Sequence, residues 1–455
     1  MNKFNCYDSN LPHAEVITPK DKNYDLLRQE WNRAIQKFPA LIVYCENEFD
    51  VSQSILYARE NNIPIRIKSG GHNYEGYSTG NKVMVIDISK INSIKINYQE
   101  NTLTVGGGIK NAQLYNYLSQ FDYPFPGGLC PTVGLSGFTL GGGWGYSSRK
   151  FGLGCDSLLE AELINYEGYL LKANKYINSD LFWALKGAGG GNFGVVTSMT
   201  FKLSPKVNSV TYFEIYCPNT SKETQVRFLD IWQRWIFNVD NSINASGGLY
   251  NTPDEKYIFL RGISYNSIDQ TKWLLKDFYS LENVSIDLES NRFLTVINNI
   301  ASSYPPYEKF KSGGRFVNTY YSLEELSNIV DIVNQPRPRD SVLTSINIYG
   351  FGGKISDVPK NETAFYYRDA RYILYIQSIW EDNFYKEYNV DWVLYNFRYI
   401  YNITYGSYIN FPTLELPHYE INYFGENIFR LKTIKEKYDP CNVFNFPQSI
   451  KIQKI

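Results

Sequence analysis

The sequence contains one histidine and one cysteine that stand in markedly glycine-rich segments. His72, one of three histidines, follows two glycines in RIKSGGHNYEGYS, and Cys130 lies within PGGLCPTVGLSGFTLGGGWG. A neutral imidazole nitrogen and a thiolate are both good nucleophiles, and glycine allows the backbone to approach a partner closely. Taken alone, each residue also fits a plain explanation, as a turn histidine or as a cysteine without chemical function. The pair nevertheless makes two candidate nucleophiles in one region.

Glycine clusters recur through the first half of the chain. They are GGH near residue 71, GGG at 106, a dense group from 127 to 145, and GAGGGNFG from 187 to 194. Glycine is costly inside regular structure, so such clusters mark places where the backbone turns sharply or comes close to something else. Four clusters within one region predict one extended ligand.

The elements that would position these residues alternate between strands and helices from about residue 40 to 203. LIVY predicts a strand, followed by a helix with Asp50 or Ser52 near its start, and IPIRIK predicts a strand that runs into glycines. VMVIDIS, SIKINY and TLTVGGG predict further short strands, and NAQLYNYLSQ a helix. The pattern indicates a mixed α+β region.

From about residue 205 the glycines become rarer and longer strands are expected. SVTYFEIYC, GGLYNT, KYIFLRGISY, SINIYGFGG and YILYIQSIW predict strands, with helices over KETQVRFLDIWQRWIF and SLEELSNIVDIVNQ. SSYPPYEKF and NQPRPRD predict loops, and the tail predicts a helix that stops at Asp439 and Pro440. This is the pattern of an antiparallel sheet covered by helices.

Length and charge narrow the class of protein. At 455 residues with a net charge of -1, the chain predicts more than one domain and lacks the positive field of a nucleic-acid or anionic-membrane binder. No signal peptide or 18-residue apolar run is found, so we expect a cytoplasmic protein, with export by another route left open.

Six scattered cysteines and three histidines favour reduced thiols and no metal site. The 39 tyrosines fit either a stacking surface or an AT-rich coding bias.

Taken in this order, the two glycine-rich segments resemble those of the berberine-bridge-enzyme-like oxidases, a branch of the vanillyl-alcohol-oxidase superfamily of flavoproteins. GAGGGNFGVVTSMTFKL and the closing YDPCNVFNFPQSI resemble that family's patterns as well. The resemblance implies FAD bound covalently twice, with His72 on the 8α-methyl carbon and Cys130 on ring carbon 6. His13 and His418 are interpreted as ordinary residues.

The same resemblance implies an α+β fold. Residues 1–204 would form an FAD-binding domain of the vanillyl-alcohol-oxidase type, and residues 205–405 a substrate domain with an antiparallel sheet covered by helices. Residues 406–455 would return to the FAD domain. The expected partners are a small-molecule substrate and O2, and we expect a monomer or homodimer.

Further cofactor contacts are expected from the glycine segments, whose backbone N–H groups can bind a pyrophosphate. In relatives the residue three after the attachment cysteine lines the flavin face where oxygen reacts, and valine leaves room there. That residue is Val133, which favours an oxidase that produces hydrogen peroxide. The remaining residues expected beside the cofactor are Ser69, Gly70, Gly71, Asn73, Gly137, Gly142, Val196, Asn442 and Gln448.

A tyrosine is expected to act as the catalytic base. In sugar-oxidising relatives this residue lies in a Y-x-N-[YF] segment, which GSYINFPTLE matches with Tyr408 and Asn410. A free tyrosine would need roughly 4 kcal/mol to ionise at pH 7, so the site must depress its pKa or couple the transfers. Tyr74 resembles a second site tyrosine. Gln377 and Tyr375 alternate to one face of a predicted strand and could face the substrate, although ordinary packing explains them equally well.

The function predicted from these residues is oxidation of an alcohol or sugar hydroxyl by hydride transfer to FAD, followed by reoxidation with O2 to H2O2. Two alternatives stay open at this point. One is a tailoring oxidase of secondary metabolism, including oxidative cyclisation. The other is a flavin-carrying coat protein with little turnover.

Overall fold

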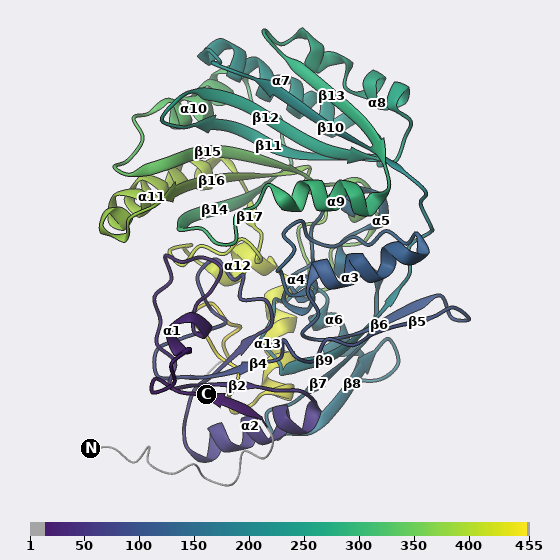
Figure 1. Cartoon of the computed structure of the whole chain (residues 1–455), viewed down its shortest axis with the longest axis vertical. Coiled ribbons are helices and arrows are strands. Elements are labelled where there is room, and N and C mark those ends of the chain that lie inside the picture. The colour runs from purple at the N-terminus through teal and green to yellow at the C-terminus, as the bar shows by residue number, and fades with distance from the viewer. Residues whose placement is uncertain (1–13, 453–455) are drawn as a thin grey trace.

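The computed structural model describes residues 14–452 and places them in three β-sheets with surrounding helices (Figure 1). Two smaller sheets occupy the lower half of the view, and one large sheet occupies the upper half. Cys6 and His13 lie outside the described residues. The chain therefore shows the α+β architecture that its sequence predicts.

The two smaller sheets are built from the first half of the chain. One is mixed, with strand order β1-β2-β4-β3, and comprises β1 (Glu15–Ile17), β2 (Leu41–Tyr44), β3 (Ile65–Lys68) and β4 (Met84–Asp87). The other is antiparallel, with order β5-β6-β9-β7-β8, and comprises β5 (Ile94–Asn97), β6 (Thr102–Gly106), β7 (Leu158–Ile164), β8 (Leu170–Asn174) and β9 (Val195–Lys202).

The large sheet is antiparallel throughout, in the order β13-β10-β12-β11-β15-β16-β14-β17. It comprises β10 (Val210–Cys217), β11 (Ile243–Asn251), β12 (Lys256–Ser264), β13 (Ser285–Asn291), β14 (Phe310–Val317), β15 (Ser341–Gly350), β16 (Tyr372–Trp380) and β17 (Gly406–Ser407). The strands predicted from SVTYFEIYC, KYIFLRGISY and YILYIQSIW are confirmed as β10, β12 and β16.

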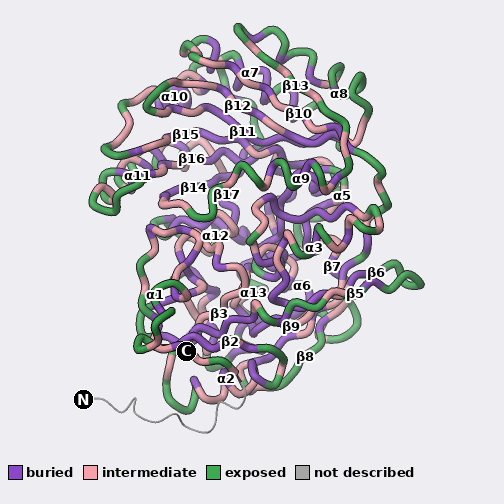
Figure 2. The backbone as a smooth tube through the Cα atoms, viewed as in Figure 1, coloured by how far each residue is buried: buried purple, intermediate pink, exposed green. Residues whose placement is uncertain are grey.

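Helices surround all three sheets. They are α1 (Tyr24–Leu27), α2 (Glu48–Glu60), α3 (Asn111–Leu118), α4 (Leu135–Leu140), α5 (Ser148–Phe151), α6 (Ser179–Leu185), α7 (Lys222–Asn238), α8 (Ile268–Leu274), α9 (Phe293–Ser302), α10 (Leu323–Asn334), α11 (Lys386–Ile403), α12 (Tyr419–Phe424) and α13 (Asn427–Tyr438). One face of the large sheet is covered by α10 and α11, and α7 packs on α10. Figure 2 shows the sheet strands buried and the outward sides of these helices exposed. The other face of the sheet is free to form a site.

One predicted boundary shifts slightly. The helix expected to begin near Asp50 or Ser52 is α2, and it starts earlier because the Asn47 side chain accepts a hydrogen bond from the Asp50 N–H, 3.0 Å away. A short polar side chain in this position satisfies an N–H group that the first helical turn leaves unpaired. The predicted end of the last helix is confirmed, since α13 stops at Tyr438, just before Asp439.

The C-terminal segment packs back onto the first half of the chain, where α13 lies against α6 (Figure 1). Lys435 and Asp439 form an ion pair of 2.6 Å in which both side chains are fully buried. The Lys435 ammonium also donates to the carbonyl oxygens of Asn192 and Phe444. These bonds tie the tail to the GAGGGNFG loop.

The division of the chain near residues 204 and 405 stays a prediction, although strands up to β9 belong to the small sheets and those from β10 onward to the large one. Along residues 14–452, none of the helices combines the length and the apolarity that crossing a membrane requires.

Candidate active site

A cavity of about 500 Å³ lies between the glycine-rich loops and the uncovered face of the large sheet. We call one side the glycine wall, formed by residues 69–73, 134–137 and 189–191. We call the other side the sheet wall, formed by side chains of β11, β12, β14, β15 and β16. The strand register explains the second wall, because directly paired residues of antiparallel strands point to the same face. Its members are Ser246, Tyr250, Phe259, Arg261, Phe310, Leu343, Asn347, Tyr349, Tyr375, Gln377 and Ile379.

The two candidate nucleophiles lie on either side of one hydroxyl group. Thr132 Oγ1 is 2.7 Å from Nε2 of His72 and 3.6 Å from Sγ of Cys130. His72 and Cys130 are 58 residues apart in the sequence, yet both line the cavity. The structure thus brings together the two residues that the sequence singled out.

Glycine packing explains why the two loops meet. A Cβ atom on Gly70 would lie 2.2 Å from the Gly134 nitrogen, and a Cβ on Gly134 would lie 2.3 Å from Oγ of Ser69. Gly71 has a φ of +68°, which residues other than glycine rarely adopt. Both loops can approach this closely only because Gly70 and Gly134 carry no side chains at the contact.

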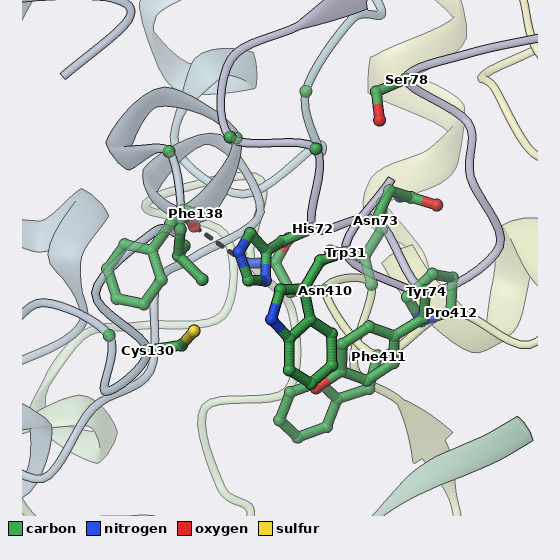
Figure 3. A pocket seen from close by; sticks show the side chains of 18 of the residues that line it. Trp31, His72, Asn73, Tyr74, Ser78, Cys130, Phe138, Asn410, Phe411 and Pro412 are labelled. Carbon is green, nitrogen blue, oxygen red and sulfur yellow. Dashed lines mark hydrogen bonds between the residues drawn. The ribbon is translucent and has the colours of Figure 1, made fainter. Parts of the chain in front are cut away.

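The environment of His72 keeps its ring neutral. Burial, and next the charge of Lys110, lower the pKa of His72 to about 3. Trp31 stacks on the ring with centroids 5.2 Å apart (Figure 3). Thr132 is bonded to Nε2, and no hydrogen bond to Nδ1 is found within residues 14–452. A neutral ring with one nitrogen held and the other available is the form that can act as a nucleophile.

Burial favours the neutral form of Cys130 as well. Burial raises the pKa of the Cys130 thiol, and hydrogen bonds from Thr132 oppose that rise. Among the described cysteines, Cys45, Cys155 and Cys217 are buried, and Cys441 is exposed and distant from the cavity lining. Cys130 alone of these five lines the cavity.

The glycine wall presents unpaired backbone donors. The N–H groups of Gly70, Gly71, His72 and Asn73 donate no hydrogen bond to any residue that the structure describes, although all four residues line the cavity. Successive free N–H groups in a loop form an anion-binding concavity. This is the donor set that a pyrophosphate needs.

Two glycines of this wall have no other explanation than close approach of a ligand. A Cβ on Gly137 would meet nothing within 4 Å, and one on Gly190 would only touch Gly137 and Leu140 at 3.5 and 4.0 Å. Neither residue has the positive φ that favours glycine. Because neither packing nor backbone conformation requires glycine here, the space beside them suits a flat cofactor that comes close to the backbone.

Two buried polar atoms on the cavity lining are left without partners by the protein. They are the hydroxyl of Tyr77 and the ring N–H of Trp31. Buried polar groups are nearly always hydrogen-bonded, so both atoms are candidates for bonds to a bound group. Together with the free N–H groups and open glycines, they fit an FAD-sized polar and aromatic cofactor.

Tyr408 is held by three N–H donors at the far end of the cavity. Its hydroxyl oxygen accepts hydrogen bonds from the backbone of Gly143 at 3.1 Å and Trp144 at 3.0 Å, and from Asn410 Nδ2 at 3.1 Å. No acceptor for its own proton is found within residues 14–452. Burial raises the pKa of Tyr408 to about 12, and the three donors oppose that rise. Asn410 is itself held by the Phe138 carbonyl at 2.9 Å (Figure 3).

The other expected catalytic residues lie on or against the sheet wall. Tyr74 stacks on Phe411 with an interplanar angle of 4° and meets Phe310 and Tyr375 edge-on (Figure 3). Burial raises the pKa of Tyr74 well above its ordinary value, so it keeps its proton. Gln377 also lines the cavity.

Most residues that the sequence placed at the site lie on the cavity lining. They are Tyr408, Tyr74, Asn410, Gln377, Tyr375, His72, Cys130, Ser69, Gly70, Gly71, Asn73, Val133, Gly137, Val196 and Gln448. Two are not, namely Gly142 and Asn442. Gly142 has a φ of +110° and belongs to the turn that aims the next two N–H groups at Tyr408. Asn442 occupies a left-handed turn after α13, with a φ of +50°. Their contact with the cofactor stays a prediction.

The sequence interpretation missed three polar residues of the site. Thr132 links the nucleophiles, Glu308 lies on the lining with a pKa that burial raises to about 7, and Arg261 projects from β12. A hydroxyl two residues after Cys130 could have been noticed. Nothing in the sequence distinguishes Arg261 or Glu308 from surface charges.

Comparison with known proteins supports the interpretation of the fold and the cofactor. Residues 39–174 match a family model described as FAD binding domain, and residues 407–451 match one described as berberine and berberine like. The uncharacterized FAD-linked oxidoreductase YgaK of Bacillus subtilis is 33% identical over 446 residues, which cover 96% of this chain and 96% of YgaK.

Solved structures agree over nearly the whole chain. BBE-like 1 of Physcomitrella patens has a TM-score of 0.89 at 28% identity, covering 97% of this chain and 98% of its own. Glucooligosaccharide oxidase from Acremonium strictum, whose structure concerns a 6-S-cysteinyl, 8α-N1-histidyl FAD, has a TM-score of 0.88 at 21% identity and covers 96% and 97%. The latter shows a shared fold. With relatives matching along its full length and family models at both ends, the chain belongs to the berberine-bridge-enzyme-like family of FAD-linked oxidoreductases.

Proposed function

We propose that this oxidoreductase is an oxidase that holds FAD through two covalent bonds, at His72 and Cys130, and oxidises the hydroxyl group of a sugar or another alcohol. The observation that carries the proposal is the position of both nucleophiles around the Thr132 hydroxyl, on the lining of a cavity with open glycines. The glucooligosaccharide oxidase that shares this fold has a 6-S-cysteinyl, 8α-N1-histidyl FAD, which is the same kind of double attachment.

The protein residues around the cofactor would each have a distinct part. His72 supplies a neutral nitrogen, and Cys130 supplies sulfur with the Thr132 hydroxyl beside it as a hydrogen-bond partner. The free N–H groups of residues 70–73 would hold the pyrophosphate. When bound, FAD accepts a hydride from the alcohol carbon and passes both electrons to oxygen.

Tyr408 would take the proton from the substrate hydroxyl. Its three N–H donors stabilise negative charge on the phenolic oxygen, as an oxyanion hole does, and leave its proton without an acceptor in the described structure. Tyr74 keeps its proton and would donate a hydrogen bond to the substrate. The carbonyl group that forms is then left beside the sheet wall.

Oxygen use is proposed from Val133. This residue lines the cavity and follows Cys130 by three positions. In the related oxidases, a valine at this position leaves room for oxygen beside the flavin. Hydrogen peroxide would be the second product.

The test combines the two parts of the proposal. After precipitation in acid, yellow colour should stay with the wild-type protein and with the His72→Ala and Cys130→Ala variants, because one bond is sufficient to retain FAD. The double variant should release its flavin. Peroxide formation should then be measured with a panel of sugars and alcohols.

Two results would contradict the proposal. Release of all flavin from the wild-type protein in acid would show that the flavin is not covalently attached. Flavin that is bleached by dithionite but by no alcohol of the panel would instead indicate a flavin-carrying protein with little turnover.

A further inference from the structure

Arg261 is an unpaired positive charge on the sheet wall. It lies on β12 and lines the cavity. No carboxylate oxygen of residues 14–452 lies within 4.0 Å of its guanidinium. Three other buried arginines lie away from the cavity lining. Arg368 forms a two-bond ion pair with Asp156, Arg149 is surrounded by backbone carbonyl oxygens, and Arg315 is held by the neutral side chains of Thr404, Ser407 and Asn422. What sets Arg261 apart from these three is its place on the cavity lining.

Every group in contact with Arg261 is neutral. Its Nη1 donates to the Ser303 hydroxyl at 2.7 Å, and its guanidinium lies 5.3 Å from the ring centre of Tyr304 and 5.8 Å from that of Phe259. The hydroxyl of Tyr146 is also close enough to influence its charge. Neutral donors and rings hold a guanidinium in place without cancelling its charge.

The one acidic residue directly opposite Arg261 in the sheet makes no ion pair with it within 4.0 Å. Glu214 of β10 is its direct partner in the strand register, but the Glu214 carboxylate accepts a hydrogen bond from Tyr212. Glu308, the acidic residue of the lining, makes no ion pair with Arg261 either. A partly buried cation without a counterion is unfavourable unless a ligand supplies the opposite charge.

We propose that Arg261 binds a carboxylate on the substrate, so that the natural substrate is an elongated alcohol with an acid group at its other end. This inference rests on the proposed function, because it assigns the remote end of the same substrate. A guanidinium matches a carboxylate with paired hydrogen bonds, which makes Arg261 a determinant of specificity.

The sheet sets the length of this substrate. Arg261 is paired with Ser246 of β11, which is paired with Tyr349 of β15, so Arg261 lies two strand spacings from Tyr349, or roughly 10 Å. Tyr349 contacts Phe411, and Phe411 contacts Tyr408. The side chains of Tyr349 and Phe411 therefore lie between the acid group and the reacting hydroxyl.

The walls between these ends favour a ring-containing molecule. Tyr250, Phe259, Tyr349 and Tyr375 all line the cavity. Aromatic side chains bind both sugar rings and aromatic rings through their faces. The shared chemistry is thus a carboxylate joined to a ring that carries an alcohol, and its source is either an acidic sugar or an aromatic hydroxy acid.

Matched acids and esters distinguish these sources. The first pair is a glucuronic-acid-terminated disaccharide and its methyl ester, and the second is 4-(hydroxymethyl)cinnamate and its methyl ester. We expect one acid of the two pairs to reduce the flavin with a kcat/KM roughly 10- to 100-fold above that of its ester, as a charged hydrogen bond predicts.

Substitutions then assign that preference to Arg261. Arg261→Gln should bring the ratio of acid to ester close to one, whereas Arg261→Lys should retain part of it. Arg234→Gln, which changes an exposed arginine on α7, is the matched control and should keep the wild-type ratio. Equal ratios in the wild type and in Arg261→Gln would overturn the proposal.

A binding measurement separates this proposal from the proposed function. Calorimetry with 4-methylcinnamate and the unreactive 1-deoxy analogue of the acidic disaccharide needs no turnover. Tight binding of one acid that Arg261→Gln weakens at least tenfold supports Arg261 even if no alcohol is oxidised. Oxidation of neutral alcohols without any binding of either acid would leave the oxidase intact and refute the carboxylate site.

Discussion

The glycine wall and the sheet wall enclose the same cavity but are built on different principles. The glycine wall acts through its backbone, with free N–H groups at residues 70–73 and open space beside Gly137 and Gly190. The sheet wall acts through side chains, which alternate toward the cavity along five strands. We expect the first wall to hold FAD and the second to select the substrate.

Two parts of the molecule position Tyr408. Its backbone follows β17 of the large sheet, and its hydroxyl accepts hydrogen bonds from N–H groups of the GGWG turn. Tyr408→Phe is expected to lower the rate of flavin reduction by roughly 10²- to 10⁴-fold, the usual contribution of a general base. Stopped-flow absorbance without oxygen measures this rate.

The pH profile tests the same residue. Since burial raises the pKa of Tyr408 to about 12, the ionised fraction and the rate should increase roughly tenfold for each pH unit in the alkaline range below that value. Tyr408→Phe should remove this increase. A variant that retains the wild-type rate and slope would exclude Tyr408 as the base.

The buried ion pair behind the glycine wall should dominate its stability. Lys435→Met leaves the Asp439 charge buried and breaks the bond to the Asn192 carbonyl, so we expect a loss of about 3 to 5 kcal/mol in the free energy of unfolding. Urea denaturation followed by circular dichroism measures it. Lys437→Met breaks a solvent-exposed pair with Asp180 and should cost less than about 1 kcal/mol. Equal losses would mean that the tail does not support this wall.

Two glycine substitutions distinguish cofactor space from protein packing. Gly137→Val places its side chain in the open cavity, so FAD content should fall while the urea midpoint of the apoprotein changes little. Gly70→Ala should lower both, because its Cβ would collide with the backbone of Gly134. If Gly137→Val kept full FAD content, the space beside this residue would not hold the cofactor.

A smaller effect is expected at the hydroxyl between the nucleophiles. Thr132→Val removes the hydrogen bond to Nε2 of His72, which is worth about 1 kcal/mol, so covalent attachment should be roughly fivefold slower. Mass spectrometry of the protein at timed intervals after FAD addition follows this rate. Thr132→Ser keeps the hydroxyl and should attach FAD at nearly the wild-type rate. Equal rates in all three proteins would show that Thr132 has no part in attachment.

Attachment at His72 should also be insensitive to mild acid. Because the pKa of His72 is lowered to about 3, chiefly by burial, its ring stays neutral where an ordinary histidine would become protonated. In the Cys130→Ala variant, the attachment rate should change little between pH 8 and pH 5. A tenfold fall for each unit below pH 6.5 would contradict this environment.

The sequence by itself determined the glycine wall. Glycine clusters show where the backbone turns sharply or comes close to a ligand, and the family resemblance of the same segments assigned His72, Cys130 and Gly137 to one site. The hydrophobic alternation likewise predicted the large antiparallel sheet, since its period depends only on neighbouring residues.

Only the tertiary structure decided which side chains complete the site. Gly142 and Gly137 look alike in the sequence, yet the first shapes the turn behind Tyr408 and the second faces open space. Arg261 becomes significant only because the strand register turns it toward the cavity, where no carboxylate of residues 14–452 lies within 4.0 Å of its guanidinium. Pairing between distant segments creates these relations, and no local pattern of residues encodes them.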